Sequence, residues 1–179
     1  MLELKNTLEV AERFKKYVIQ QSRSNLTKGR NNVSRSLYNS LKGETIVENN
    51  YAIVGFTMDQ YGQYLDEGVK GAFPNMVKNG KQKAPNSRFK FTNKKPPVEP
   101  LIKWAKARKI RLRNEDGTYK KGSYRTLGFI LQKRIYAQGI KPTLFFTKPF
   151  ENALKRFVDK EMEDGFVSDI DVIVDLNLK

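Results

Sequence analysis

The chain has 179 residues, with 34 Lys and Arg against 19 Asp and Glu, no His and no Cys, and its formal net charge is +15. Without His or Cys it can form no Ser-His-Asp or Cys-His catalytic system, no disulfide and no thiolate metal site, so that only carboxylate sites for hard cations remain open. The length suits one domain over residues 1–179, and the chain has neither an apolar run long enough to span a membrane nor a secretory leader, so we expect a protein made and kept inside a cell.

The first third of the chain predicts two helices and a hairpin. Apolar residues recur at helical spacing over residues 2–22, and a second, shorter helix is predicted over residues 33–42. Two runs rich in Val, Ile and aromatic residues lie within residues 44–58 and flank a polar turn, which is typical of a β-hairpin. Asp59 is expected to cap a short helical turn that Gly68 ends.

The positive charge is concentrated in the middle of the sequence. Residues 70–113 contain 14 Lys and Arg and a single acid, whereas residues 157–179 contain 2 Lys and Arg and 7 acids. The first part of the basic segment mixes Pro, Gly, Asn and Lys without periodicity, which predicts a long basic loop inserted at about residues 69–97. Loops of this length are usually functional or remain disordered until a partner binds.

The second half predicts three helices and a final strand. Pro100 lies in the first turn of one helix, Ser123 caps a second that Gly139 ends, and Thr147 caps a third that runs to Gly165. Alternating apolar residues over 170–178 predict the strand. The fold class is therefore α+β: a small antiparallel sheet, made of the hairpin and the C-terminal strand, packed against amphipathic helices with a long basic loop.

Charged side chains in three places are the candidate partner-contact residues. The basic loop supplies most of them, a Gly-bounded acidic pair follows two tyrosines, and two more acids lie on the predicted last strand. Phe73, Phe89 and Phe91 interleave with the basic residues, and they either stack on bases or anchor the loop to a neighbouring element. The candidates are Lys78, Lys81, Lys83, Arg88, Lys90, Lys94, Lys95, Asp66, Glu67, Asp169 and Asp171.

The carboxylates offer little for catalysis. The one Glu-x-Lys sequence, Glu3-Leu4-Lys5, has no Asp before it, and Asp169 and Asp171 are more simply a solvated strand face than a metal pair. Asp66 and Glu67 are expected to stabilise their turn and to pair with a basic neighbour, within the chain or across a subunit contact. We therefore predict no catalytic residue, no cofactor and no metal, and keep a metal-dependent nuclease only as a third hypothesis.

Three segments together resemble the tail-completion, or neck, family of tailed bacteriophages. They are Tyr61-Gly-Gln-Tyr-Leu-Asp-Glu-Gly68, Pro97-x-x-Pro-Leu-Ile-Lys-Trp-Ala-Lys-Ala-Arg-Lys-Ile110 and Gly139-Ile-Lys-Pro-Thr-Leu-Phe-Phe-Thr-Lys-Pro-Phe150. Members of the family carry a Tyr-rich turn ending in Glu-x-Gly-Thr, a variable loop, and a basic-Pro-x-x-Phe motif before the last helix. This chain departs from that pattern with Asp66-Glu67-Gly68-Val69 and with a longer basic loop.

The resemblance implies a structural virion protein rather than an enzyme. Such a protein forms a ring with its own copies between the portal or adaptor protein and the tail proteins, is assembled in the host cytoplasm, and has no membrane partner. The basic loop then contacts either a protein neighbour or, transiently, the genomic DNA. We favour the protein neighbour, because a strongly basic channel would bind the DNA that must pass through it. The alternative function is sequence-independent nucleic-acid binding by residues 70–113.

Overall fold

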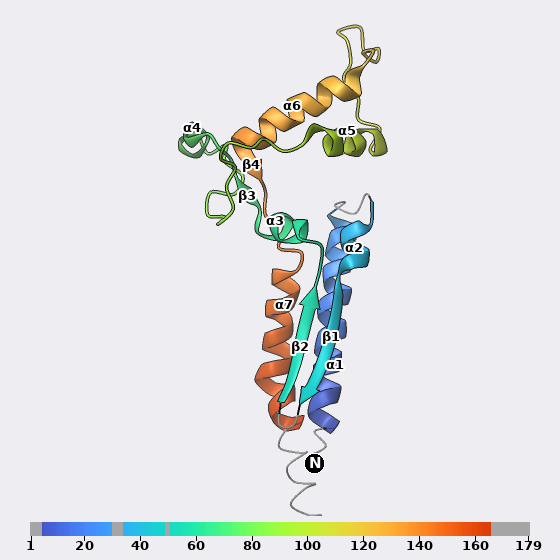
Figure 1. Ribbon diagram of the computed structural model, residues 1–179, viewed down its shortest axis with the longest axis vertical. Helices are drawn as coiled ribbons and strands as arrows, with labels where there is room; N and C mark the ends of the chain where they lie inside the picture. The colour runs from blue at the N-terminus through green and yellow to red at the C-terminus, as the bar shows by residue number, and fades with distance from the viewer. Residues whose placement is uncertain (1–4, 30–33, 49–50, 166–179) are drawn as a thin grey trace, which may run out of the picture. The chain divides into compact units, whose positions relative to one another are not determined.

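The computed structural model describes residues 5–29, 34–48 and 51–165. These residues form an α+β fold, as predicted, in which helices dominate and the strands make two small antiparallel pairs (Figure 1). The chain divides into two compact units. Unit 1 contains residues 1–59 and 144–179, and unit 2 contains residues 60–143. The single domain predicted for residues 1–179 stays a prediction.

Unit 1 combines two long helical segments with the hairpin. Its elements are α1 (Lys5–Lys28), α2 (Ser36–Ser40), β1 (Lys42–Glu48), β2 (Tyr51–Thr57), α7 (Thr147–Ala153) and a π-helical continuation of α7 (Leu154–Met162). α1 packs against α7, its continuation and both strands, and Figure 1 shows the hairpin lying along these helices. Both predicted strands are therefore confirmed, and the first helix extends further than predicted.

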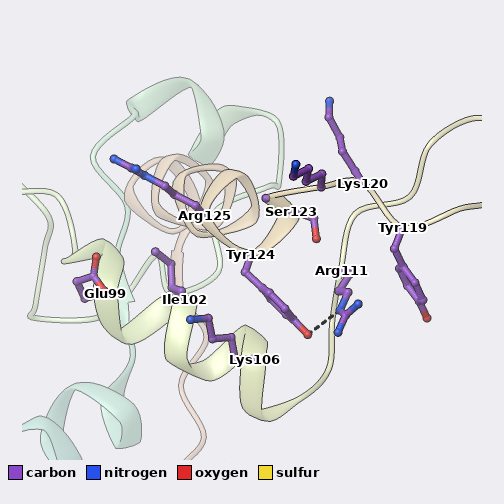
Figure 2. Close-up of a pocket in the computed structure, with 11 residues that line it drawn as sticks. Glu99, Ile102, Lys106, Arg111, Tyr119, Lys120, Ser123, Tyr124 and Arg125 are labelled. Atoms are coloured by element: carbon purple, nitrogen blue, oxygen red, sulfur yellow. Dashed lines mark hydrogen bonds between the residues drawn. The ribbon is translucent and has the colours of Figure 1, made fainter.

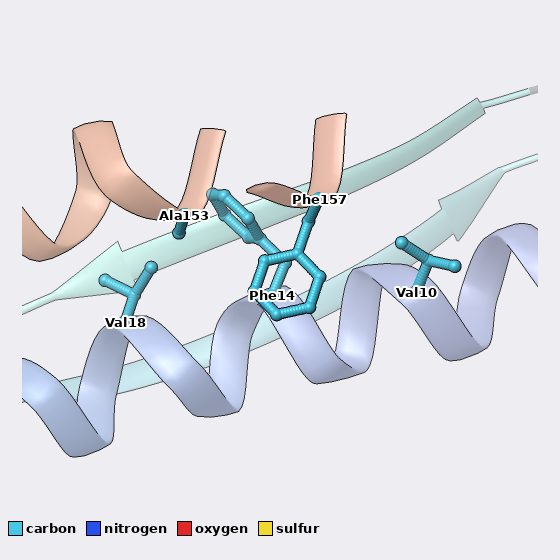
Figure 3. Close-up of a cluster of buried hydrophobic side chains, with 5 residues drawn as sticks. All are labelled: Val10, Phe14, Val18, Ala153 and Phe157. Carbon is cyan, nitrogen blue, oxygen red and sulfur yellow. The ribbon is translucent and has the colours of Figure 1, made fainter. Parts of the chain in front are cut away.

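Aromatic side chains fill the core of unit 1. Phe14 of α1 is buried and meets the rings of Phe56, Phe150 and Phe157 at centroid distances of 6.1, 5.8 and 6.3 Å. Figure 3 shows Phe14 facing Phe157 and Ala153 from across the helix pair. Such ring pairs add to the stability gained from apolar burial, so these aromatic side chains stabilise the packing of the helices and the hairpin.

The hairpin separates an inner from an outer face. Thr45 lies opposite Val54 in the register, and both are partly buried beside the helices. The next pair, Ile46 and Ile53, points to the other face and is exposed. This alternation is the period of two that a strand pair covered on one side requires.

Unit 2 consists of short elements and two longer helices. They are α3 (Tyr61–Glu67), β3 (Val69–Lys70), α4 (Pro74–Lys78), α5 (Val98–Ala107), α6 (Ser123–Gln138) and β4 (Gly139–Ile140). α5 packs on α6, where a Cβ atom on Gly128 would approach Ile102 Cγ1 to 2.6 Å. Glycine at this position lets the two helices lie in close contact.

The two ends of unit 2 meet at the β3–β4 pair, in which Val69 lies opposite Ile140 and Lys70 opposite Gly139. Thr143 also donates its backbone N–H and its hydroxyl to the Leu65 carbonyl at the end of α3. Gly139 has φ +84°, and a Cβ atom there would lie 2.1 Å from the Val69 carbonyl oxygen. The pairing therefore depends on glycine.

The structure corrects several local predictions. The prediction of a loop from Val69 is wrong at its start, because β3 and α4 form there. Residues 79–97, all of which are described, contain no helix. Asp59 does not cap α3, whose N-cap is Gln60; it instead accepts a hydrogen bond from Ser36 at 2.7 Å.

The helix starts and the last strand give three further outcomes. Ser123 and Thr147 are the first residues of their helices, and neither α6 nor α7 has a side-chain cap. The predicted 33–42 helix is shorter because β1 already begins at Lys42. The strand predicted over residues 170–178 lies outside the described residues.

Gly139→Ala is expected to destabilise unit 2 severely, because the new Cβ atom would collide with the Val69 backbone and the residue would keep a left-handed conformation. We expect a loss of at least about 3 kcal/mol in the free energy of unfolding, measured by urea denaturation. Gly80→Ala is the matched control: Gly80 has φ +64° with nothing within 4 Å of the built Cβ, so its cost is only the strain of about 1 kcal/mol. Equal losses in the two variants would contradict the close approach.

Candidate functional site

The net charge of the protein belongs to one of its two units. Unit 2 contains 20 Lys and Arg and 5 Asp and Glu, a net charge of +15, whereas unit 1 contains 14 of each and is neutral. A compact unit with this excess attracts anions over distances of about one Debye length, roughly 8 Å at physiological salt. Any anionic partner is therefore expected to meet unit 2.

The structure leaves the predicted basic contact residues accessible and the acidic pair largely engaged. All seven cations are exposed. Asp66 is only 4% exposed and is therefore not accessible to a partner, and Glu67 pairs with Arg88 at 2.6 Å. Arg88 is therefore the basic neighbour predicted for this pair, and it bonds Glu67 within the chain. The seven cations are Lys78, Lys81, Lys83, Arg88, Lys90, Lys94 and Lys95.

Backbone hydrogen bonds tie the basic segment to the rest of unit 2. Lys70 donates its N–H to the Phe89 carbonyl at 2.7 Å, and Phe91 donates to the Lys70 carbonyl at 2.9 Å. The Gln82 side chain bonds both the N–H and the carbonyl of Gly71. The segment therefore follows a defined path that presents its lysines outward.

The phenylalanines of this segment contact rings of neighbouring elements. Phe89 lies 4.6 Å from Tyr64 between ring centroids, and Phe73 and Phe91 lie 6.0 and 6.1 Å from Tyr136. The Tyr136 hydroxyl also donates to the carbonyl of Thr92. Of the two predicted roles for these phenylalanines, the contacts favour anchoring over base stacking.

Three further points concern the acidic residues of the predicted last strand, a metal site and a membrane-spanning helix. Asp169 and Asp171 lie outside the described residues. Within the described ranges, no three His, Cys, Asp or Glu side chains gather where they could hold a metal ion. No helix in the described part of the chain combines the length and apolar character needed to cross a bilayer.

A cationic cleft that the sequence reading missed lies between α5 and the start of α6. We call this cleft of about 620 Å³ the Arg111 cleft. Figure 2 shows Lys106 of α5, Arg111 and Tyr119 of the loop between the helices, and Tyr124 and Arg125 of α6 around it. Five cations line the cleft against one carboxylate, and they are Lys106, Arg111, Lys120, Lys121 and Arg125, with Glu99 as the acid.

Two tyrosines hold Arg111 in place. Its Nε donates to the Tyr124 hydroxyl at 2.8 Å, and its guanidinium carbon lies 5.1 and 5.2 Å from the ring centroids of Tyr119 and Tyr124. The hydrogen bond to Tyr124 raises the pKa of Arg111 above its ordinary value. Arg111 is therefore a fixed, fully charged group at the cleft.

A small turn positions Tyr119 beside these cations. Arg113 bridges to Tyr119, and Asn114 donates its N–H to the Thr118 carbonyl at 2.8 Å. At its tip, the Asp116 carboxylate accepts bonds from the Thr118 N–H and hydroxyl at 2.9 and 2.7 Å. The turn brings Tyr119 to Arg111, a contact that the sequence spacing alone did not show.

No protein-family model, no curated protein and no solved structure matches this chain.

The turn that carries Tyr119 is expected to loosen in acid. Hydrogen bonds from Thr118 hold the pKa of Asp116 below its ordinary value, so the ionised carboxylate stabilises the folded turn. This contribution is fully present above the ordinary Asp pKa and is lost as the pH falls through the lower folded value. The Thr118 amide shift, followed by NMR, should therefore titrate below the ordinary Asp range.

Asp116→Ala supplies the control for this titration, since it removes both acceptor bonds and should abolish the acidic step in the Thr118 shift. If the Thr118 shift of the unaltered protein titrates at or above the ordinary Asp pKa, the hydrogen bonds of the turn do not stabilise the ionised Asp116 carboxylate.

Proposed function

We propose that this protein is a structural subunit of the head-to-tail junction of a tailed bacteriophage, a neck or tail-completion ring subunit that joins the portal–adaptor complex of the capsid to the tail. In this role it associates with its own copies, with the portal or adaptor protein and with tail proteins, is assembled in the host cytoplasm and ends in the virion. The role requires binding surfaces and no catalysis.

Contacts between distant motifs support the proposal. Two of the three segments that resemble the neck family, residues 61–68 and 139–150, touch each other in unit 2. Gly68 has φ +73°, and a Cβ atom there would lie 2.5 Å from the Ile140 carbonyl oxygen. The resembling residues therefore form one local structure, although more than 70 positions separate them in the sequence.

The observation that carries the proposal is the division of charge between the units. Like-charged surfaces oppose association, so copies that met through unit 2 would bring two +15 surfaces together. The neutral unit 1 carries no such penalty, and its hairpin presents the directly opposed Ile46 and Ile53 with 44% and 48% of their surfaces exposed. Unit 1 is thus suited to contact other copies, and unit 2 to contact an anionic neighbour.

Ile46→Lys is expected to prevent self-association, because it places a charge on the outer face of the hairpin without touching the core. Size-exclusion chromatography with light scattering would measure the oligomer, and electron microscopy would identify rings, for the protein alone and mixed with portal and adaptor proteins. Lys141→Ala, an exposed substitution in unit 2, is the control and should leave assembly unchanged.

The proposal fails if the unaltered protein remains monomeric with every neck partner and is absent from purified virions. If rings form equally well with Ile46→Lys, the contact between copies does not use the outer face of the hairpin.

The charge of unit 2 also favours a second candidate function, sequence-independent nucleic-acid binding by the exposed cations of residues 78–95. Binding by several phosphate contacts predicts an affinity that falls steeply with salt. Replacing Lys81, Lys83, Lys90 and Lys94 together with Ala should weaken binding to DNA at low salt and flatten its salt dependence, as measured by fluorescence anisotropy. Tight binding that is insensitive to salt would contradict this candidate.

A further inference from the structure

The cations of the Arg111 cleft are not neutralised within the described part of the chain. No ion pair there joins Lys106, Arg111, Lys120, Lys121 or Arg125 to a carboxylate, although Arg88 in the same unit is paired with Glu67. Unpaired cations that line a concave surface attract anions. At about 620 Å³, the cleft falls within the usual size range of ligand sites.

The geometry of Arg111 suits a phosphate group. Its Nε is already used by the Tyr124 hydroxyl, and its guanidinium carbon contacts the rings of Tyr119 and Tyr124. The terminal Nη groups remain as a pair of parallel donors, the arrangement that binds phosphate in a bidentate manner. Because the side chain is already ordered, little rotamer entropy is lost when an anion binds.

A second groove continues from the Arg111 cleft along α6. This Phe129 groove, of about 500 Å³, shares Lys121, Gly122 and Arg125 with the first cleft and adds Phe129 and Ile130, both exposed. Gly122, at the boundary between the two, has φ +69° and open space around a built Cβ atom. A chain-like ligand can therefore pass from one groove to the other over the Gly122 backbone.

We infer that the Arg111 cleft and the Phe129 groove together bind single-stranded nucleic acid, with phosphates at Arg111 and its neighbouring lysines and a base against Phe129. Exposed aromatic rings beside a cationic groove are the two elements that single-strand binding requires. Phe129, 45% of whose surface is accessible, lies beside the cations of the groove and offers the stacking surface that a base uses. The inference rests on the second candidate function. It places the main nucleic-acid contacts at the start of α6 rather than at the lysines of residues 78–95.

The test measures the affinity of the full chain for a fluorescein-labelled oligothymidylate of about 12 nucleotides, within the range of single-strand site sizes, by anisotropy over a salt series. Phe129→Ala changes no charge and should weaken binding by about tenfold, the loss expected for one stacked base, with an unchanged salt slope. Arg111→Ala should weaken binding by at least about tenfold and reduce the salt slope by about one.

Two further variants separate geometry from charge. Lys141→Ala removes one exposed charge of unit 2 outside the grooves and should weaken binding by less than about twofold, since one peripheral phosphate contact contributes little. Arg111→Lys keeps the charge but loses the planar donor pair, so it should resemble Arg111→Ala in affinity while retaining the salt slope. Circular dichroism of each variant checks that unit 2 remains folded.

Three results would overturn the inference. If Phe129→Ala and Arg111→Ala weaken binding no more than Lys141→Ala does, the oligonucleotide binds elsewhere on the basic surface, and only the second candidate function stands. If a duplex of equal length binds as tightly and ignores Phe129→Ala, or if a poly-Glu peptide displaces the oligonucleotide at equal charge concentration, the ligand is of another class. If the protein binds no nucleic acid, both ideas fail, while the assembly experiment remains a separate test of the ring.

Discussion

The close backbone approach between β3 and β4 is the constraint on which the arrangement of unit 2 depends. This unit is an insertion into unit 1, and its two ends are held together by two residue pairs and by the bonds from Thr143 to the end of α3. Gly71 shares the requirement for a small residue, because a Cβ atom there would lie 2.2 Å from the Ala137 carbonyl oxygen. The path of the basic segment follows from this pairing, since residues 89–91 bond to Lys70 of β3.

Local patterns in the sequence predicted the elements that local interactions determine. α1 and the hairpin have clear periodicity, and Gly139 ends α6 as expected, since glycine tolerates the left-handed conformation. β3, however, is two residues long and exists because Lys70 pairs with Gly139, a contact that no short window of sequence contains. The Arg111 cleft was missed for the same reason, because the contact between Arg111 and Tyr124 depends on how the α5–α6 loop folds back.

The candidate contact residues divide along similar lines. The exposure of the basic residues in 78–95 could be predicted from composition, because lysine side chains are almost never fully buried. The roles of the aromatic residues could not be predicted from composition, because stacking on bases and anchoring to a neighbouring element use the same side chains. The contacts with Tyr64 and Tyr136 favour anchoring for Phe89, Phe73 and Phe91, although Phe73 is still 50% exposed, as against 45% for Phe129 on α6.

The unequal division of charge has a thermodynamic consequence for any assembly of this protein. Each copy carries a net charge of +15, so an assembly of several copies accumulates positive charge and long-range repulsion opposes association, although the neutral unit 1 adds no local repulsion where it forms the contact. An anion that binds unit 2 relieves that repulsion, and by linkage the assembled state must in turn bind the anion more tightly. Association and anion binding would then be two halves of one coupled equilibrium, with ionic strength acting on both.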